Sequence, residues 1–139
     1  MIIERVQHFD PILISRLFQA SGTPIKEANE NFFQSQDNIL LTARSDAEYM
    51  GFLYAYVLQA VASVQPQVFL YSIDVFSRYQ RQGVGRTLIN ELKAIADAKR
   101  CAEIFVLTNA SNVAANHLYQ QTGGVRENPD DVMYVYPLR

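Results

Sequence analysis

The sequence predicts an α/β domain in which helices flank a mixed β-sheet. Residues 68–75 are rich in β-branched and aromatic side chains, and a glycine-bearing turn and an amphipathic helix follow them. A second strand-to-helix unit begins at residues 103–108. Two earlier apolar segments, joined by a polar turn, favour an antiparallel hairpin ahead of these units. Helices that alternate with strands behind an antiparallel start are typical of a mixed α/β sheet.

The composition agrees with one globular domain that spans all 139 residues. Hydrophobic residues make up 49% and charged residues 19% of the chain, which argues against disorder. The formal net charge of −2 offers no broad basic surface, so we expect no nucleic-acid partner. Residues 50–64 are too few and too rich in tyrosine to cross a membrane. Because the chain has one cysteine, Cys101, and no recognisable signal peptide, we expect a cytoplasmic protein.

The N-terminal third carries two helix-start signals. Residues 2–6 favour a short opening strand. Asp10 is a favourable N-cap, Pro11 is a favourable first helical residue, and Gly22 is a typical stop. A Thr-Pro pair repeats the start signal within residues 23–36, where apolar side chains again follow at helical spacing. We therefore expect two consecutive helices before the hairpin.

Residues 38–43 and 49–64 are expected to form the antiparallel hairpin. Along the second strand Tyr54 and Tyr56 fall on one face, because side chains alternate with a period of two. Aromatic rings attract cations, so these tyrosines are candidates for lining an amine pocket. Ordinary packing within the sheet is the more common role for such residues.

A polar turn that begins a helix carries the strongest functional signal. Glycine permits unusual backbone dihedrals and close approach of a ligand, and the first amides of a helix attract anions such as phosphate. Two arginines add positive charge. The candidate diphosphate-binding residues are Gln80, Arg81, Gln82, Gly83, Val84, Gly85 and Arg86.

Two well-known phosphate loops do not match this turn. Counted from Gly83, the Walker pattern and the dinucleotide fingerprint both require a glycine at position 88, where this chain has Leu88. The alternative to a phosphate site is a tight strand-to-helix turn whose glycines are incidental.

The C-terminal third predicts a strand, a helix and a tail. Residues 103–108 form a compact strand candidate, residues 109–112 offer several N-cap candidates in succession, Asn112 among them, and Gly123 is a typical helix stop. The tail is expected to supply one or two last strands, at residues 125–127 and 132–136, around a polar turn.

Two motifs resemble the GNAT superfamily of N-acetyltransferases. Gln/Arg-x-x-Gly-x-Gly at residues 80–85 resembles its acetyl-CoA signature. Asn-x-x-Ala-x-x-Leu-Tyr-x-x-x-Gly at residues 112–123 resembles a second signature, while Ser77 stands where many members carry proline. The resemblance implies the GNAT fold, with a mostly antiparallel central sheet of about six or seven strands and about four flanking helices. It also implies acetyl-CoA as the cosubstrate.

The finer pattern is similar to that of aminoglycoside 3-N-acetyltransferases. The similarity lies in residues 55–58, in Tyr71-x-x-Asp74, in residues 81–83 together with 88–90, and in residues 131–133. Ser72 stands where those enzymes often have aspartate, and Asp74 lies two positions later on the same strand face. The resemblance therefore implies a small cationic amine as the acceptor, either an aminoglycoside or another amine.

The family resemblance implies direct acetyl transfer from acetyl-CoA to a primary amine within a ternary complex. It assigns Tyr119 as the acid that protonates the departing thiolate, and the backbone N–H of Val75 as the oxyanion donor. Asp74 is the candidate base, with water as the alternative, and its charge could also hold a cationic acceptor. The competing interpretations are a packing role for Tyr119 and a structural role for Asp74.

The remaining candidates complete this expected site. Outside the turn, the cofactor-binding candidates are Ile73, Val75, Asn112 and Ala115. The substrate-binding candidates are Tyr54, Tyr56, Ser72 and Asp74. No spacing of histidine, cysteine and carboxylate residues suggests a metal. The competing function is a non-catalytic acyl-CoA sensor with the same fold, and the resemblance is also compatible with a homodimer.

Overall fold

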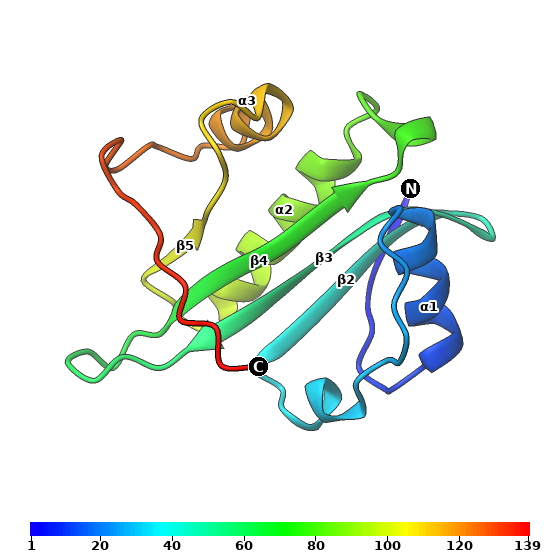
Figure 1. Ribbon diagram of the computed structural model, residues 1–139, viewed down its shortest axis with the longest axis horizontal. Helices are drawn as coiled ribbons and strands as arrows, with labels where there is room; N and C mark the ends of the chain where they lie inside the picture. Colours follow the sequence, from blue (N-terminus) through cyan, green and yellow to red (C-terminus); the bar gives the residue numbers. More distant parts are fainter.

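The computed structural model describes all 139 residues as one five-stranded sheet with helices on both faces (Figure 1). The strands lie in the order β1-β2-β3-β4-β5, with antiparallel pairing up to β4 and parallel pairing of β4 with β5. The elements in chain order are β1 (Ile2–Arg5), α1 (Pro11–Ala20), η1 (Glu30–Gln34), β2 (Asn38–Ser45), β3 (Glu48–Leu58), β4 (Gln67–Val75), η2 (Ser77–Tyr79), α2 (Val84–Ala98), β5 (Glu103–Val106) and α3 (Val113–Gln121). The predicted mixed α/β sheet is confirmed.

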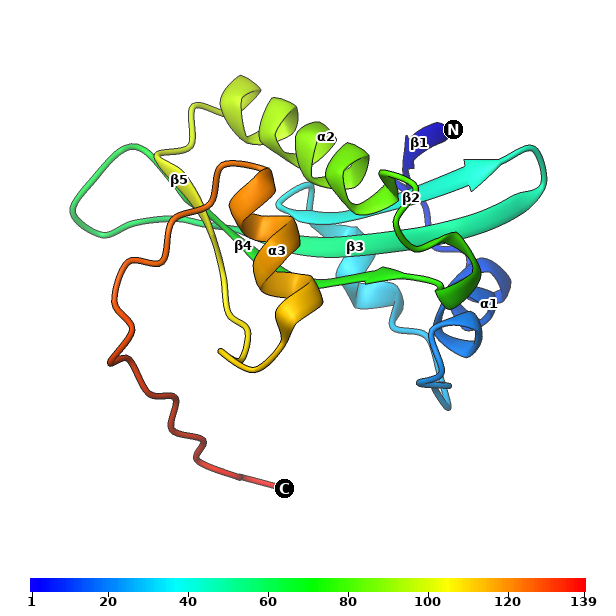
Figure 2. The same cartoon turned by 90° about the horizontal axis from the view of Figure 1, so that it is seen from above.

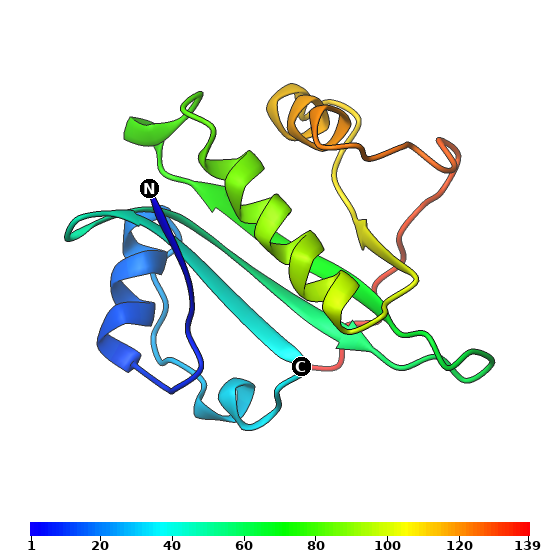
Figure 3. The same ribbon diagram turned by 180° about the vertical axis from the view of Figure 1, so that it is seen from behind.

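Two hydrophobic clusters hold the helices to the sheet. Helix α2 crosses one face of the sheet, where Leu88 and Leu92 are fully buried against β2, β3 and β4 (Figure 3). This is the apolar face that the helical spacing predicts. Helix α1 packs on the opposite face, where Leu17 meets Phe52 of β3. The predicted N-cap is present, because the Leu13 amide donates to Asp10 Oδ1 at 3.1 Å.

The prediction of a second N-terminal helix is wrong. Residues 23–36 contain only the short 3₁₀ helix η1, and its N-cap residue Asn29 has an extended backbone. The ring of Phe32 instead packs edge-on against Tyr54 and Tyr56. In so short a segment this packing outweighs the amphipathic pattern, because an α-helix of few turns has little stability of its own.

The second hairpin strand is shorter than expected. β3 ends at Leu58, which pairs with Gln67 at the start of β4. The intervening residues form an exposed loop, and the side chains of Val61 and Val64 are 107% and 98% exposed. Because Val61 and Val64 are apolar, the strand-like pattern of the sequence continues past Leu58, although the chain leaves the sheet there.

A β-bulge in β4 determines which side chains reach each face of the sheet. Tyr54 pairs with Ser72 and the next residue, Ala55, pairs with Leu70, so Tyr71 has no partner in β3. Ile73 therefore points with Leu70 toward α2, as does Val75, whereas the two residues between Leu70 and Ile73 both point the other way. The face away from α2 carries Phe69, Tyr71, Ser72 and Asp74.

The predicted C-terminal strands are absent. Residues 125–139 form no strand, and their large apolar side chains are exposed, including Tyr134 at 82% and Tyr136 at 87%. The tail runs clear of the sheet (Figure 2), so its backbone groups have no partner strand. Because the tail adds no strand, the sheet has five strands, fewer than the six or seven that the resemblance implied. The structure also has three α-helices, where about four were expected.

Candidate functional site

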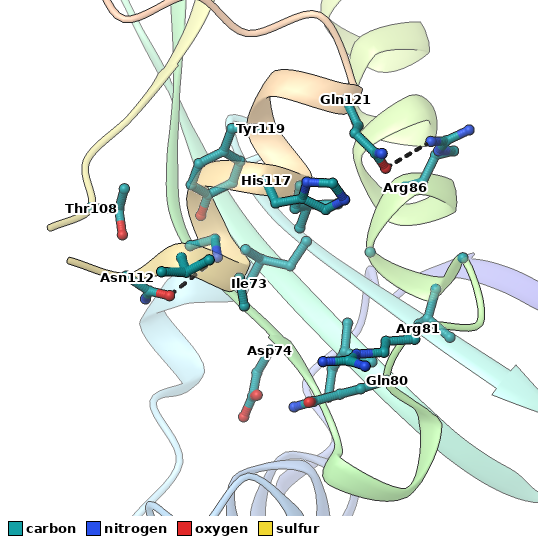
Figure 4. Close-up of a pocket in the computed structure, with 18 residues that line it drawn as sticks. Ile73, Asp74, Gln80, Arg81, Arg86, Thr108, Asn112, His117, Tyr119 and Gln121 are labelled. Atoms are coloured by element: carbon teal, nitrogen blue, oxygen red, sulfur yellow. Dashed lines mark hydrogen bonds between the residues drawn. The ribbon is translucent and has the colours of Figure 1, made fainter. Parts of the chain in front are cut away.

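A cleft opens where β4 and β5 diverge. The two strands pair only from Gln67 to Leu70 of β4, which then continues to Val75 without a neighbour on that edge. Helix α3 lies beside the gap, and the resulting cleft has a volume of about 1010 Å³ (Figure 4). Its lining residues are Ile73, Asp74, Val75, Gln80, Arg81, Gly83, Val84, Gly85, Arg86, Thr108, Asn112, Val113, Ala114, Ala115, His117, Leu118, Tyr119 and Gln121.

The first turn of α2 presents free amides to this cleft. Gly83 precedes the helix in a left-handed conformation with φ of 81°, and no side chain caps the helix start. The amides of Val84, Gly85 and Arg86 donate to no protein acceptor. Free amides at a helix N-terminus favour an anion, and the side chains of Arg81 and Arg86 line the same cleft.

The two glycines of the turn have different structural requirements. A Cβ at Gly83 would meet nothing within 4 Å, so this position needs glycine for its backbone conformation alone. A Cβ at Gly85 would lie 3.0 Å from Leu118 Cδ2, so the second glycine allows α3 to approach α2 closely. This approach brings the second motif to the cleft.

The free edge of β4 directs backbone groups into the cleft. The Phe76 amide donates to Met50 O of β3 at 2.9 Å. Because alternate residues of a strand direct their amides to opposite edges, the Val75 amide faces the side where β5 has diverged. Gln80 holds the following loop to this strand through a 3.2 Å hydrogen bond from Nε2 to Val75 O. A Cβ at Gly51 would lie 2.5 Å from Asp74 O, so glycine there permits the close pairing of β3 with this end of β4.

Tyr119 directs a phenol into the cleft from α3 (Figure 4). Its hydroxyl makes no hydrogen bond within the protein, and burial raises its pKa above the ordinary tyrosine value. The phenol is therefore protonated at neutral pH and free to donate a proton to a ligand.

Asp74 is the one carboxylate among the lining residues. Its side chain extends from β4 away from Tyr119 (Figure 4). Burial raises the pKa of this carboxyl above the ordinary aspartate value. The two groups therefore occupy different parts of the cleft, and each is held by a different element.

Asn112 and Ala115 lie at the start of α3, on the wall opposite β4. Asn112 Oδ1 accepts a 3.1 Å hydrogen bond from the Ala115 amide, which is the N-cap that the sequence predicts. Both residues line the cleft, so the capping role and a contact with a ligand are compatible.

Four predicted site residues lie outside the cleft lining. Gln82 Nε2 donates to Arg78 O at 3.3 Å instead. Tyr54 and Tyr56 share one face of β3, as predicted, with ring centroids 6.3 Å apart. Ser72 pairs with Tyr54 across the strands, on the sheet face that Asp74 shares.

Sequence reasoning missed one face of α3 and a residue in the loop that follows β5. Val113, His117 and Gln121 recur every four residues, and all three line the cleft. Gln121 Oε1 accepts a 3.1 Å hydrogen bond from Arg86, which links this face to the start of α2. The four-residue spacing was visible in the sequence, but only the position of α3 shows that this face borders the cleft. The remaining lining residues that were not predicted are Thr108, Ala114 and Leu118.

The structure contains no group of three or more histidine, cysteine or acidic side chains placed to hold a metal ion. None of its helices combines the length and apolarity that crossing a membrane requires.

Solved structures of acetyltransferases share this fold over the whole chain. An aminoglycoside acetyltransferase, meta-AAC0020, from an uncultured soil metagenomic sample superposes with a TM-score of 0.86 at 26% identity, covering 99% of this chain and 96% of that one. That protein has been solved with trehalose and with sisomicin. Ribosomal-protein-alanine N-acetyltransferase from Brucella melitensis biovar Abortus 2308 superposes with a TM-score of 0.78 at 18% identity, covering 99% and 100% of the two chains.

A third neighbouring structure was solved with bound CoA. Aminoglycoside N-acetyltransferase AAC(6')-Iy in complex with CoA has a TM-score of 0.73 at 23% identity, and the match covers 99% of each chain. No curated protein sequence gives a significant match. The sequence profile of the acetyltransferase (GNAT) family matches residues 9–124, which contain both motifs and the whole cleft. This chain therefore belongs to the acetyltransferase (GNAT) family.

Proposed function

We propose that this protein transfers the acetyl group of acetyl-CoA directly to a primary amine of a small cationic acceptor. Acetyl transfer from acetyl-CoA to an amine is the activity of its family. The observation that supports this chain's own activity is one cleft with three features: unbonded helix amides, a free strand edge and a protonated phenol.

The residues present fit acetyl-CoA as a substrate. The amides of Val84, Gly85 and Arg86 provide donors for its diphosphate, and the arginines supply positive charge. The free edge of β4 at Ile73 and Val75 offers amides to the extended arm that carries the thioester. Asn112 and Ala115 complete the wall opposite this edge.

The chemistry needs three groups in addition to the substrates. A neutral amine nitrogen attacks the thioester carbon, and the Val75 amide stabilises the oxyanion that forms. The carbon–sulfur bond then breaks, and Tyr119 donates its proton to the departing thiolate. The proton that the amine loses passes to Asp74 or to water, and solvent restores the phenol proton.

The proposed acceptor class rests on charge and on similarity. A carboxylate at Asp74 attracts a cationic amine. Support comes also from the soil acetyltransferase solved with sisomicin, so aminoglycosides are among the acceptors to test.

Replacement of Asp74 with asparagine should weaken acceptor binding. We expect Asp74→Asn to raise the KM for a cationic amine about tenfold, because the favourable charge is lost. In the native enzyme the same KM should rise as pH falls and the carboxylate becomes protonated. Because burial raises the pKa of Asp74, this rise should begin at a higher pH than for an exposed aspartate. Initial rates measured across pH for both proteins check this, and an unchanged KM and pH profile in the variant would remove Asp74 from the site.

Release of the CoA thiol, measured over a panel of amines, tests the function itself. An acetyltransferase should release thiol in proportion to acetylated amine. The competing function, a non-catalytic acyl-CoA sensor, should bind acetyl-CoA in calorimetry and release no thiol with any amine in the panel.

We further propose that residues 1–139 act as one domain in the cytoplasm, a location supported by the single cysteine, Cys101. A homodimer is also proposed, because the exposed apolar tail, residues 132–138, offers a large unpaired surface. Neither a metal nor a nucleic-acid partner is part of this proposal.

A further inference from the structure

Five aromatic rings form a continuous layer on the sheet face away from α2. We call this layer the aromatic platform, and its members are Tyr54, Tyr56, Phe69, Tyr71 and Phe105. Tyr71 lies at its centre, with ring centroids 5.3 Å from Tyr54, 5.8 Å from Tyr56 and 5.5 Å from Phe69. Phe69 and Phe105 stack nearly parallel at 4.8 Å, which extends the platform from β3 across β4 to β5.

The bulge in β4 connects this platform to the cleft. In a regular strand Tyr71 and Ser72 would point to opposite faces. The extra residue at Tyr71 lets both point away from α2, and Asp74 follows Ser72 on the same face. The platform and the carboxylate that lines the cleft therefore belong to one surface.

Part of this surface is open to a ligand. Phe32 of η1 covers one side, where it contacts Tyr54 and Tyr56. No helix covers the β4–β5 side of this face (Figure 1), and Tyr71 is 56% exposed. Burial raises the pKa of Tyr54 and of Tyr56 above the ordinary tyrosine value, so these two hydroxyls stay protonated at neutral pH.

The charge of this surface limits which acceptors it can hold. Asp74 is the one carboxylate of the cleft, and no platform residue carries a charge. The acidic residues of the tail, Glu127, Asp130 and Asp131, lie in a segment that stands clear of the sheet on the side away from α2 (Figure 2). A ligand with several ammonium groups would leave most of them without a partner, whereas one ammonium group matches one carboxylate.

We propose that the aromatic platform binds the body of the acceptor, and that the acceptor is a singly charged primary amine bearing an aromatic ring. The amine lies at Asp74 beside the cleft, and the ring stacks on Tyr71 and its neighbours. This proposal rests on the acetyltransferase function proposed above and narrows its substrate class.

Initial rates with three amines test the proposal at saturating acetyl-CoA. The probes are 2-phenylethylamine, the ring-free n-butylamine, and sisomicin as a polycation. We expect the KM for 2-phenylethylamine to be at least tenfold lower than that for n-butylamine, and lower than that for sisomicin. The ratio of these two KM values for the singly charged amines should change little when the ionic strength rises from about 0.02 to about 0.2 M, because salt screens the charge attraction of both amines equally and does not screen ring stacking.

Two variants separate stacking from indirect effects. Tyr71→Ala should raise the KM for 2-phenylethylamine about tenfold, while the KM for acetyl-CoA stays unchanged. Val64→Ala shortens an exposed apolar side chain in the loop between β3 and β4 and should change neither constant. Saturation-transfer NMR of 2-phenylethylamine with the protein and CoA gives a second readout, which should lose intensity at the ring protons in Tyr71→Ala only.

Other outcomes overturn the proposal and leave the acetyltransferase function standing. These are a lower KM for sisomicin than for 2-phenylethylamine, or an unchanged KM in Tyr71→Ala. A rise in KM for every amine in the Asp130→Asn/Asp131→Asn variant would show instead that the tail supplies acceptor-binding charge. If no amine releases thiol, the proposed function fails, and the NMR comparison alone decides whether the platform binds aromatic amines.

Discussion

Removing the Tyr119 hydroxyl should lower kcat about 100-fold, the usual scale for the loss of a general acid. The phenol is held protonated by burial and has no hydrogen-bond partner in the protein. Tyr119→Phe therefore removes the proton donor and leaves the fold and the cleft unchanged. Steady-state rates with acetyl-CoA and a reactive amine measure the loss, and calorimetry should give the same Kd for acetyl-CoA in both proteins.

A control variant and the pH dependence of kcat test the same role of the Tyr119 hydroxyl. Tyr134→Phe alters an exposed tyrosine of the tail and should keep the native kcat. In the native enzyme kcat should fall at high pH as the phenol ionises, at a pH above that of an ordinary tyrosine because its pKa is raised. Tyr119→Phe should lack this fall, and a variant with full turnover would leave the hydroxyl with no role in proton transfer.

Replacement of Gly83 with alanine should raise the Kd for acetyl-CoA about tenfold, a loss of about 1.4 kcal/mol. An L-residue in the left-handed region is strained by about 1 kcal/mol. Relief of this strain would rotate the first turn of α2, whose amides are the proposed diphosphate donors. Calorimetric titration with acetyl-CoA measures the change.

Gly22 supplies a close control for this experiment. It has a φ of 84° against 81° for Gly83, and a Cβ would meet nothing within 4 Å at either position. Gly22→Ala and Gly83→Ala should therefore lower the free energy of unfolding by similar amounts, of about 1 kcal/mol. Only the second should weaken acetyl-CoA binding, and an equal Kd in both variants would show that the diphosphate does not depend on this turn.

Local sequence patterns predicted the elements that carry the chemistry. Three features depend only on residues a few positions apart, so the sequence predicts them without knowledge of the fold. They are the turn at Gly83, the buried face of α2 and the Asn112 N-cap. The two motifs, together with the end of the strand before the first of them, identified most residues of the cleft. Gln82 was included because it lies inside the first motif, although its side chain turns back to Arg78 O.

Predictions that needed a partner from elsewhere in the chain were less successful. Residues 23–36 have helical spacing, but Phe32 packs on β3 and only a short 3₁₀ helix forms. Residues 132–136 have strand-like composition, but no edge lies beside them to accept their hydrogen bonds. In both cases the local signal was present and the tertiary contact decided the outcome.

The family, the α/β class and the amide-bearing turn can all be predicted from the amino-acid sequence, because each is encoded by short-range spacing of glycine, apolar and capping residues. Only the tertiary structure showed that β5 leaves β4 after Leu70 and opens a cleft. Only it revealed the bulge that turns Tyr71 and Asp74 to the same face. Strand register and divergence result from pairing between distant segments, and no local pattern specifies them.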